Sequence, residues 1–360
     1  MAGQQTRAGE RGAQGGQLQM RAALLHGVGD VRVGNVPRAA PGDGEVLLAV
    51  RAVALCGSDR HYYLEGGIGG SRVDSPLILG HELAAEIAPD QAEATALPAG
   101  TLVAVEPARP CGRCEWCAQG HPNLCPHVRF AGSPPDQHGA LAEFFAAPPT
   151  CLFPLPPGMK AAEGALLEPL GVAIHALDLA RIRAMDTVLV LGAGAIGLLM
   201  LQVARLAGAA EVFAVDPLPD RLAVARALGA SAAAPTCDPV AGWTAGRGVD
   251  VVLEATDAAD AVAAAAEAVR IGGRLILAGI PSTDSLSLRA STLRRKGLTL
   301  KIVRRMKHTY PRAIAMVSAG RVRLDPLITH RFPLARAPEA FAVHAQRRDG
   351  VIRAVVEIPG

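Results

Sequence analysis

A glycine-rich turn between an aliphatic run and a helical stretch constrains the fold of this chain more than any other feature. Residues 188–191 run directly into Gly192-Ala193-Gly194-Ala195-Ile196-Gly197, and a helical pattern follows. Glycine is needed because the backbone turns tightly, approaches a pyrophosphate without a Cβ in the way, and lets the helix pack close to the strand. The helix N-terminus then faces the phosphate charge. A GxGxxG match alone is common in a chain rich in Ala and Gly, but this strand, turn and helix context indicates a dinucleotide site.

The same alternation of strand and helix continues after the turn. The candidate strands are 187–191, 211–215, 249–253, 274–278 and 298–303, and the candidate helices are 196–206, 218–228 and 258–269. This order predicts an α/β domain of the Rossmann type, a doubly wound parallel sheet covered on both faces. We expect this domain to span residues 168–304.

The choice of dinucleotide depends on Asp216, which comes at the end of the second strand of this series, directly after residues 211–215. A carboxylate at this offset receives the adenosine ribose hydroxyls and repels a 2′-phosphate, which favours NAD over NADP. Arg221 lies within reach of the same ribose edge, so NADP remains an alternative. The residues assigned to the cofactor are Gly192, Gly194, Ile196, Gly197, Asp216, Arg221, Thr256 and Gly279.

The remaining chain has a different texture. From about residue 21 to residue 157, short aliphatic runs such as 46–50 and 102–105 are broken by Pro and Gly clusters, which is typical of a mostly β domain with long loops. The tail after residue 305 is too small to be a domain, and we expect it to return to the first one. The first domain would then comprise 20–167 and 305–360. Residues 1–19 lack the apolar core of a secretion signal, and we interpret them as a disordered leader.

Composition excludes several classes of function. The 36 basic and 33 acidic residues give a formal charge of +3 without charge blocks, so we expect no nucleic-acid partner. No window contains the eighteen or so uninterrupted apolar residues of a membrane helix. Without an export signal, we expect a cytoplasmic protein whose seven cysteines stay reduced, and their spacing should be examined first for metal binding.

Four of these cysteines fall within fifteen residues, namely Cys111, Cys114, Cys117 and Cys125. Four thiolates at these spacings can close a tetrahedron around zinc and leave no position for a substrate, which predicts a structural site. Buried free cysteines or disulfides do not explain the clustering. A zinc-ribbon module that binds nucleic acid normally pairs two CxxC knuckles across a longer gap, which is missing here.

A second set of possible ligands is scattered over the chain, with each member beside a glycine. Cys56 precedes Gly57, and His81-Glu82 follows Gly80. One thiolate, one imidazole and one carboxylate would supply three zinc ligands and leave the fourth position to water or an alcohol. Zinc lowers the pKa of the alcohol toward neutrality, so that hydride can pass to a nicotinamide. Each residue alone could be an ordinary core or surface residue; together they indicate a catalytic zinc.

These motifs occur in the same order in the zinc-dependent medium-chain alcohol dehydrogenases, and from about residue 21 onward the chain resembles their polyol, sorbitol dehydrogenase-like branch. The segment Cys56-Gly57-Ser58-Asp59-Arg60-His61-Tyr62 matches a pattern of this branch. The resemblance implies a GroES-like catalytic domain, one catalytic and one structural zinc, NAD, and a homo-oligomer, a tetramer or a dimer. It also implies that Ser58 and His61 carry the alcohol proton to solvent and that Tyr62 lines the pocket. Glu168 lies in the segment that carries a third cysteine ligand in simple alcohol dehydrogenases. The resemblance leaves open whether Glu168 or Glu82 holds the zinc or its water.

One departure from the branch concerns the substrate. Its members tend to have Phe-Arg-Tyr where this chain has Val303-Arg304-Arg305. If Arg304 takes the role of the family arginine, then Arg305 replaces an aromatic residue and either binds a carboxylate or points to solvent. We therefore predict an NAD-linked dehydrogenase of a polyol or sugar derivative. The alternatives are a dehydrogenase of a hydroxy acid or amino alcohol, such as a hexonate or threonine, and a non-catalytic protein that binds NAD and zinc.

Overall fold

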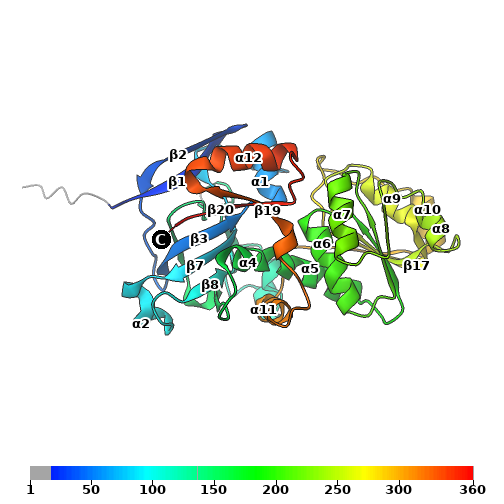
Figure 1. Cartoon of the computed structure of the whole chain (residues 1–360), viewed down its shortest axis with the longest axis horizontal. Coiled ribbons are helices and arrows are strands. Elements are labelled where there is room, and N and C mark those ends of the chain that lie inside the picture. Colours follow the sequence, from blue (N-terminus) through cyan, green and yellow to red (C-terminus); the bar gives the residue numbers. More distant parts are fainter. Residues whose placement is uncertain (1–17, 136, 360) are drawn as a thin grey trace, which may run out of the picture.

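The computed structural model describes residues 18–135 and 137–359. The chain forms two lobes that lie side by side, with α4, α5 and α11 where they meet (Figure 1). Most of the expected leader, 1–17, lies outside the described residues, and strand β1 begins at Gln19. Within the described residues, no helix is both long enough and apolar enough to cross a membrane.

The second lobe contains a six-stranded sheet in which every neighbouring pair is parallel. Its order is β15-β14-β13-β16-β17-β18, so the direction of winding reverses between β13 and β16, where doubly wound folds bind their ligands. The strands are β13 (Thr187–Leu191), β14 (Glu211–Val215), β15 (Ala232–Ala234), β16 (Val249–Glu254), β17 (Val269–Leu277) and β18 (Thr299–Ile302).

Helices cover both faces of this sheet because its central strand β13 is aliphatic on both sides. Val188 and Val190 belong to one buried cluster, and the alternate residues Leu189 and Leu191 belong to another. The first face is covered by α5 (Leu167–Ala180) and α6 (Ala195–Leu206), with α7 (Pro219–Ala227) beside them. The second is covered by α8 (Val240–Trp243), α9 (Ala261–Ala268) and α10 (Ala290–Lys296) (Figure 1).

The first lobe is built on a seven-stranded sheet of order β12-β8-β7-β3-β20-β19, in which β11 also pairs with β3. The strands are β3 (Val46–Ala54), β7 (Glu82–Ile87), β8 (Leu102–Val105), β11 (Phe144–Ala147), β12 (Leu152–Pro154), β19 (Ile328–Pro333) and β20 (Arg353–Glu357). A smaller sheet contains β1 (Gln19–Gly27), β2 (Asp30–Pro37) and β6 (Leu77–Ile78). Because β20 pairs antiparallel with β3, the C-terminal tail completes the sheet of the N-terminal lobe. The predicted fold class, a doubly wound sheet beside a mostly β domain, is confirmed.

The two lobes share one apolar core. Ala52, Ala54 and Ala104 of the first sheet are fully buried in the same cluster as Leu167 and Leu170 of α5. Helix α4 (Ala161–Ala165) lies over β3, β7 and β8, and because it consists mainly of alanine and glycine, helix and sheet can approach closely. The shared core therefore holds α5, with Glu168 near its start, against both lobes.

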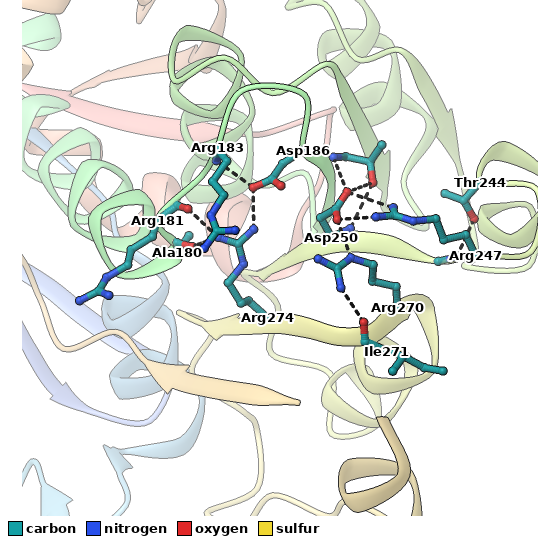
Figure 2. A network of polar contacts seen from close by, with 12 residues as sticks. Ala180, Arg181, Arg183, Asp186, Thr244, Arg247, Asp250, Arg270, Ile271 and Arg274 are labelled. Carbon is teal, nitrogen blue, oxygen red and sulfur yellow. Dashed lines mark hydrogen bonds and ion pairs between the residues drawn. The ribbon is translucent and has the colours of Figure 1, made fainter. Parts of the chain in front are cut away.

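A network of ion pairs joins the amino ends of β13, β16 and β17 (Figure 2). Asp250 accepts hydrogen bonds from Arg247, Arg270 and the backbone and hydroxyl of Thr187. Beside it, Asp186 accepts one from Arg274, which also donates to backbone carbonyls at the end of α5. Burial alone would raise the pKa of Asp250, but the hydrogen bonds from Arg247, Thr187 and Arg270 outweigh it and hold the pKa below its ordinary value.

Asp250→Asn is expected to lower the free energy of unfolding by about 2 kcal/mol, since it weakens several charge-assisted hydrogen bonds at once. A carboxyl with a depressed pKa stabilises the fold fully above its pKa in the unfolded chain, about 3.9, and loses this contribution as the pH falls through its pKa in the folded chain. Urea unfolding should therefore give the same difference at about pH 7 and pH 5, and a smaller one below about pH 4.

The matched control is Asp325→Asn. Asp325 pairs with Arg323 at 3.3 Å, but both side chains are more than half exposed, so we expect a change below about 0.5 kcal/mol. Equal effects of the two variants would contradict a stabilising role for the Asp250 network.

Candidate functional site

Cys56 and His81 are brought together by the start of a helix and the residue before a strand. Cys56 is the N-cap of α1 (Gly57–Glu65), and His81 directly precedes β7. Buried Asp59 connects them: it accepts hydrogen bonds from the backbone of Cys56 at 2.9 Å and of Gly80 at 3.4 Å, and lies 3.9 Å from the His81 ring. Gly80 has φ +89°, and a Cβ there would lie 2.7 Å from Val53, so only glycine fits this approach.

The third member of the cluster is Glu82, the first residue of β7. Ligand atoms of Cys56, His81 and Glu82 all lie within 4.8 Å of one another. Glu82 is fully buried, and burial raises the pKa of its carboxyl, whereas Arg353 opposes that shift through an ion pair of 2.6 Å to Oε1. Its Oε2 has no partner among the described residues. An unpaired buried acceptor beside a thiol and an imidazole fits a bound cation, and this donor set suits zinc.

Glu168 lies outside this group of three within the part of the chain that the structure describes. It is the second residue of α5 and is buried, and its burial raises the pKa of the carboxyl to about 8. Among the charged groups that act on it, His81, which lowers this pKa, and Glu82, which raises it, have the largest effects. The structure therefore brings Glu82 directly to the thiol and imidazole, and Glu168 to their surroundings.

Helix α1 carries the residues expected to handle the proton and the substrate. Ser58 lies in its first turn, and His61 and Tyr62 are buried. His61 is paired through Nδ1 with Glu65 Oε1 at 3.0 Å, and the Glu65 side chain is 40% exposed, so the imidazole is connected to a group that reaches solvent. Among the described residues, no hydrogen bond joins Ser58 to His61.

The four remaining candidate ligands lie in a separate segment, residues 111–125, around the short helix α3 (Glu115–Ala118). We call this segment the thiol lobe. The sulfur atoms of Cys111, Cys114, Cys117 and Cys125 lie within 4.8 Å of one another. The backbone N–H of Arg113 lowers the pKa of the Cys111 thiol, which favours the thiolate that a metal requires. Four sulfur donors at this separation fit a closed zinc site.

The expected dinucleotide residues converge at the carboxyl ends of β13 and β16. Gly192 has φ +93°, and a Cβ on Gly197 would lie 1.8 Å from the Gly192 carbonyl, so α6 can approach the strand only with glycine there. Ile196 lies in the first turn of α6. Asp216 accepts a hydrogen bond from the backbone of Ala193 at 2.8 Å, and so lies against the glycine turn.

The other three cofactor candidates surround the same turn. Arg221 lies 3.5 Å from Asp216 and faces Gly194. Thr256 follows β16 and Gly279 follows β17, and a Cβ on Gly279 would lie 2.0 Å from the Thr256 carbonyl. This arrangement leaves backbone and small residues along the edge where a dinucleotide would lie, so the residues present fit NAD.

Several residues of the site were not identified from the sequence. Glu254 at the end of β16 accepts hydrogen bonds from the backbone of Thr256 and Gly279. Asp257 pairs with Arg60 of α1 at 2.9 Å and with Arg347 at 2.5 Å, which connects the two lobes beside the site. For Arg353 a signal was available, since it is a charged residue directly before the aliphatic run 354–356.

The two arginines of the substrate assignment are separated by the structure. The Arg304 side chain is exposed, and its carbonyl accepts a hydrogen bond from Asn123 of the thiol lobe at 3.1 Å. The Arg305 guanidinium lies 4.2 Å from the centre of the Phe130 ring, and Phe130 in turn packs against His81 with ring centres 5.0 Å apart.

Comparison with known proteins places the chain among zinc enzymes. Residues 42–157 match the family model of the alcohol dehydrogenase GroES-like domain, and residues 195–319 match that of zinc-binding dehydrogenases. Sorbitol dehydrogenase of Bacillus subtilis is 33% identical over 94% of this chain and 97% of its own, and human sorbitol dehydrogenase is 37% identical over 88% and 90%. The solved structure of L-idonate 5-dehydrogenase from Escherichia coli superposes with a TM-score of 0.86 at 26% identity, covering 94% of this chain and 98% of that one.

Proposed function

The chain belongs to the zinc-dependent medium-chain alcohol dehydrogenases, and on that premise we propose that it oxidises a secondary hydroxyl of a polyol or sugar derivative with NAD as hydride acceptor. The observation that carries the proposal is the group formed by Cys56, His81 and Glu82. It lies adjacent to a dinucleotide-binding fold, which would hold the NAD that accepts the hydride. The sorbitol dehydrogenases that the chain resembles along nearly its whole length support a polyol as substrate.

We assign the catalytic zinc to Cys56, His81 and Glu82, and the structural zinc to the four thiols of the lobe. When bound, the catalytic zinc supplies Lewis acidity that lowers the pKa of the alcohol, and NAD accepts the hydride. Arg353 holds one oxygen of Glu82, which leaves the other for the metal. Glu168 lies beside this set and is assigned to the open position, where its carboxyl can hydrogen-bond the substrate hydroxyl or the water it replaces.

The alcohol proton leaves along α1 in this proposal. Ser58 is one helical turn from His61, so their side chains share a face of the helix. His61 passes the proton toward Glu65, to which it is hydrogen-bonded and which is partly exposed. For the cofactor, Asp216 favours a ribose with free hydroxyls over one with a 2′-phosphate, and Arg221 is the residue that would have to move to admit NADP.

We further propose that the enzyme acts in the cytoplasm as a homo-oligomer, a tetramer or a dimer. None of the seven cysteines, all of them among the described residues, forms a disulfide, which suits a reducing compartment. Sedimentation of the purified protein decides the subunit count, and a monomer at micromolar concentration would contradict the oligomer.

The proposed function is tested with the purified enzyme in two measurements. Metal analysis should give close to two zinc ions per chain, and NADH formation should be seen with at least one member of a panel containing sorbitol, xylitol, threonine and hexonates. Oxidation of threonine alone would mean that the substrate is an amino alcohol and not a polyol or sugar derivative. If no member of the panel is turned over, the proposal is overturned.

A second candidate substrate, a hydroxy acid, is favoured by one observation. Arg305 is the one arginine of the pair whose side chain turns inward, over the ring that packs on His81.

A further inference from the structure

The Arg305 guanidinium is partly buried beside the proposed metal site without a partner of its own. Its Nη1 is buried and donates to no acceptor, and among the described residues the side chain makes no hydrogen bond or ion pair. Burial lowers the pKa of this guanidinium to about 10, so it still carries its charge at neutral pH. Buried donors in native proteins are nearly always paired, so an unpaired one indicates a missing ligand or water.

The backbone directs this side chain inward. Arg305 has φ +54°, a left-handed conformation that residues other than glycine rarely adopt, whereas the adjacent Arg304 has its side chain exposed. The carbonyl of Arg304 is fixed by Asn123, and the next residue, Met306, is buried in the core shared by the lobes. Anchors on both sides thus hold the turn, and such strained residues cluster at ligand sites.

The neighbours of Arg305 place it in the substrate region. Its guanidinium stacks on Phe130, whose ring also packs on His81. Tyr62, Glu168 and Glu106 are close enough to influence its charge, yet neither carboxyl pairs with it, and Glu106 accepts a hydrogen bond from the backbone of Ala108. The positively charged guanidinium of Arg305 is therefore separated from His81, a candidate metal ligand, only by the Phe130 ring, and its hydrogen-bond donors are unused among the described residues.

We propose that Arg305 binds a carboxylate of the substrate, so that the enzyme acts on a sugar acid of the aldonate class in preference to the neutral polyol. The inference rests on the proposed function, whose reaction it leaves unchanged: the carbinol carbon gives hydride to NAD, the hydroxyl gives its proton to the relay, and the carboxylate takes no part in bond breaking. A guanidinium fork matches a carboxylate with two parallel hydrogen bonds, whereas a hydroxyl can accept from it only singly. A phosphate dianion fits less well, because two further carboxyl groups lie nearby.

Matched substrate pairs provide the test. Zinc-loaded enzyme is assayed with D-gluconate against D-sorbitol and with L-idonate against L-iditol, which differ only in the terminal group. We expect kcat/KM to be at least about 30-fold higher for the acid of the preferred pair, as for a buried charge pair. In Arg305→Met the ratio of acid to polyol should fall about 30-fold or more, mainly through KM, because a contact distant from the reacting carbon binds substrate and transition state alike.

Two further variants separate this role from a structural one. Arg305→Lys keeps the charge without the fork and should restore part of the ratio. Arg321→Met removes an exposed arginine beyond α11 (Tyr310–Ser318) and should leave the ratio unchanged. A variant that merely misfolds would lower kcat/KM equally for the acid and the polyol, so the ratio of the two would stay the same.

The outcomes that overturn the inference differ from those that overturn the function. If the hexitol is used as well as the hexonate and Arg305→Met leaves the ratio unchanged, the carboxylate assignment is wrong while the dehydrogenase function stands. Preference for D-sorbitol 6-phosphate over D-gluconate would also overturn it, in favour of a phosphate. If no alcohol is oxidised, the proposed function fails. Binding of D-gluconate to the NADH-bound enzyme, measured by calorimetry, then still decides the inference. The inference is wrong if wild type and Arg305→Met bind D-gluconate equally.

Discussion

Cys56→Ser is expected to hold one zinc ion per chain instead of two and to lose at least about 10³-fold in kcat/KM with every substrate of the wild type. The variant removes one of three donors that lie within 4.8 Å of one another. The Lewis acidity of a bound metal contributes several kcal/mol of transition-state stabilisation, and each 1.4 kcal/mol is about a factor of ten in rate. The loss should appear in kcat as well as in kcat/KM, because the interaction acts on the reacting oxygen.

Serine is the informative replacement because Cys56 is also the N-cap of α1. Serine is a favoured N-cap residue, so the helix that carries Ser58 and His61 keeps its start. The control is Cys237→Ser, which changes a thiol of similar exposure outside both clusters and should retain two zinc ions and full activity. Two zinc ions and near-normal turnover in Cys56→Ser would show that this thiol is no ligand.

The dinucleotide half of the site could be predicted from the sequence because its determinants are local. The strand, the glycine turn and α6 are consecutive, and the expected ranges 187–191 and 196–206 agree with β13 and α6 to within one residue. Strand β15 was missed because Ala232–Ala234 is short and made only of alanine, which has low strand propensity. Helix α5 was missed as well, since Pro169 interrupts its pattern, although proline is tolerated in the first turn of a helix. The start of β17 was expected inside a helix, because Val269 directly follows α9 without an intervening loop.

The other half of the site depends on contacts between distant residues, which spacing does not encode. Cys56, His81 and Glu82 could be suggested as a set, but the sequence could not rank Glu82 against Glu168. That distinction depends on where α5 packs. The partner of Glu82 is Arg353, more than 270 positions away, and the two meet only because β20 pairs with β3 beside β7. The direction of Arg305 likewise depends on a positive φ that nothing in the local sequence demands.

The thiol lobe has a second role that distance along the chain conceals: it contacts the segment that carries Arg305. Asn123 donates a hydrogen bond to the Arg304 carbonyl, and His121 is hydrogen-bonded to Lys307 at 3.0 Å through its ring. Residues on both sides of Arg305 therefore touch the lobe. A metal that orders the lobe would also fix the turn on which the substrate contact depends.

Cys117→Ser should consequently match Cys56→Ser in zinc content, with one ion per chain. The two variants should differ in their sensitivity to trypsin and in the activity that remains. Structural zinc sites of small modules contribute about 10 to 16 kcal/mol of apparent binding free energy, so loss of one thiolate should leave residues 111–125 without fixed structure. We expect trypsin to cut after the exposed Arg113 at least about 100-fold faster than in the wild type, whereas Cys56→Ser should be cut at the wild-type rate. The remaining activity should show a higher KM, because the turn at Arg305 is released while Cys56, His81 and Glu82 stay in place. Cleavage after Arg113 at the wild-type rate, with one zinc ion lost, would mean that packing rather than metal holds the lobe.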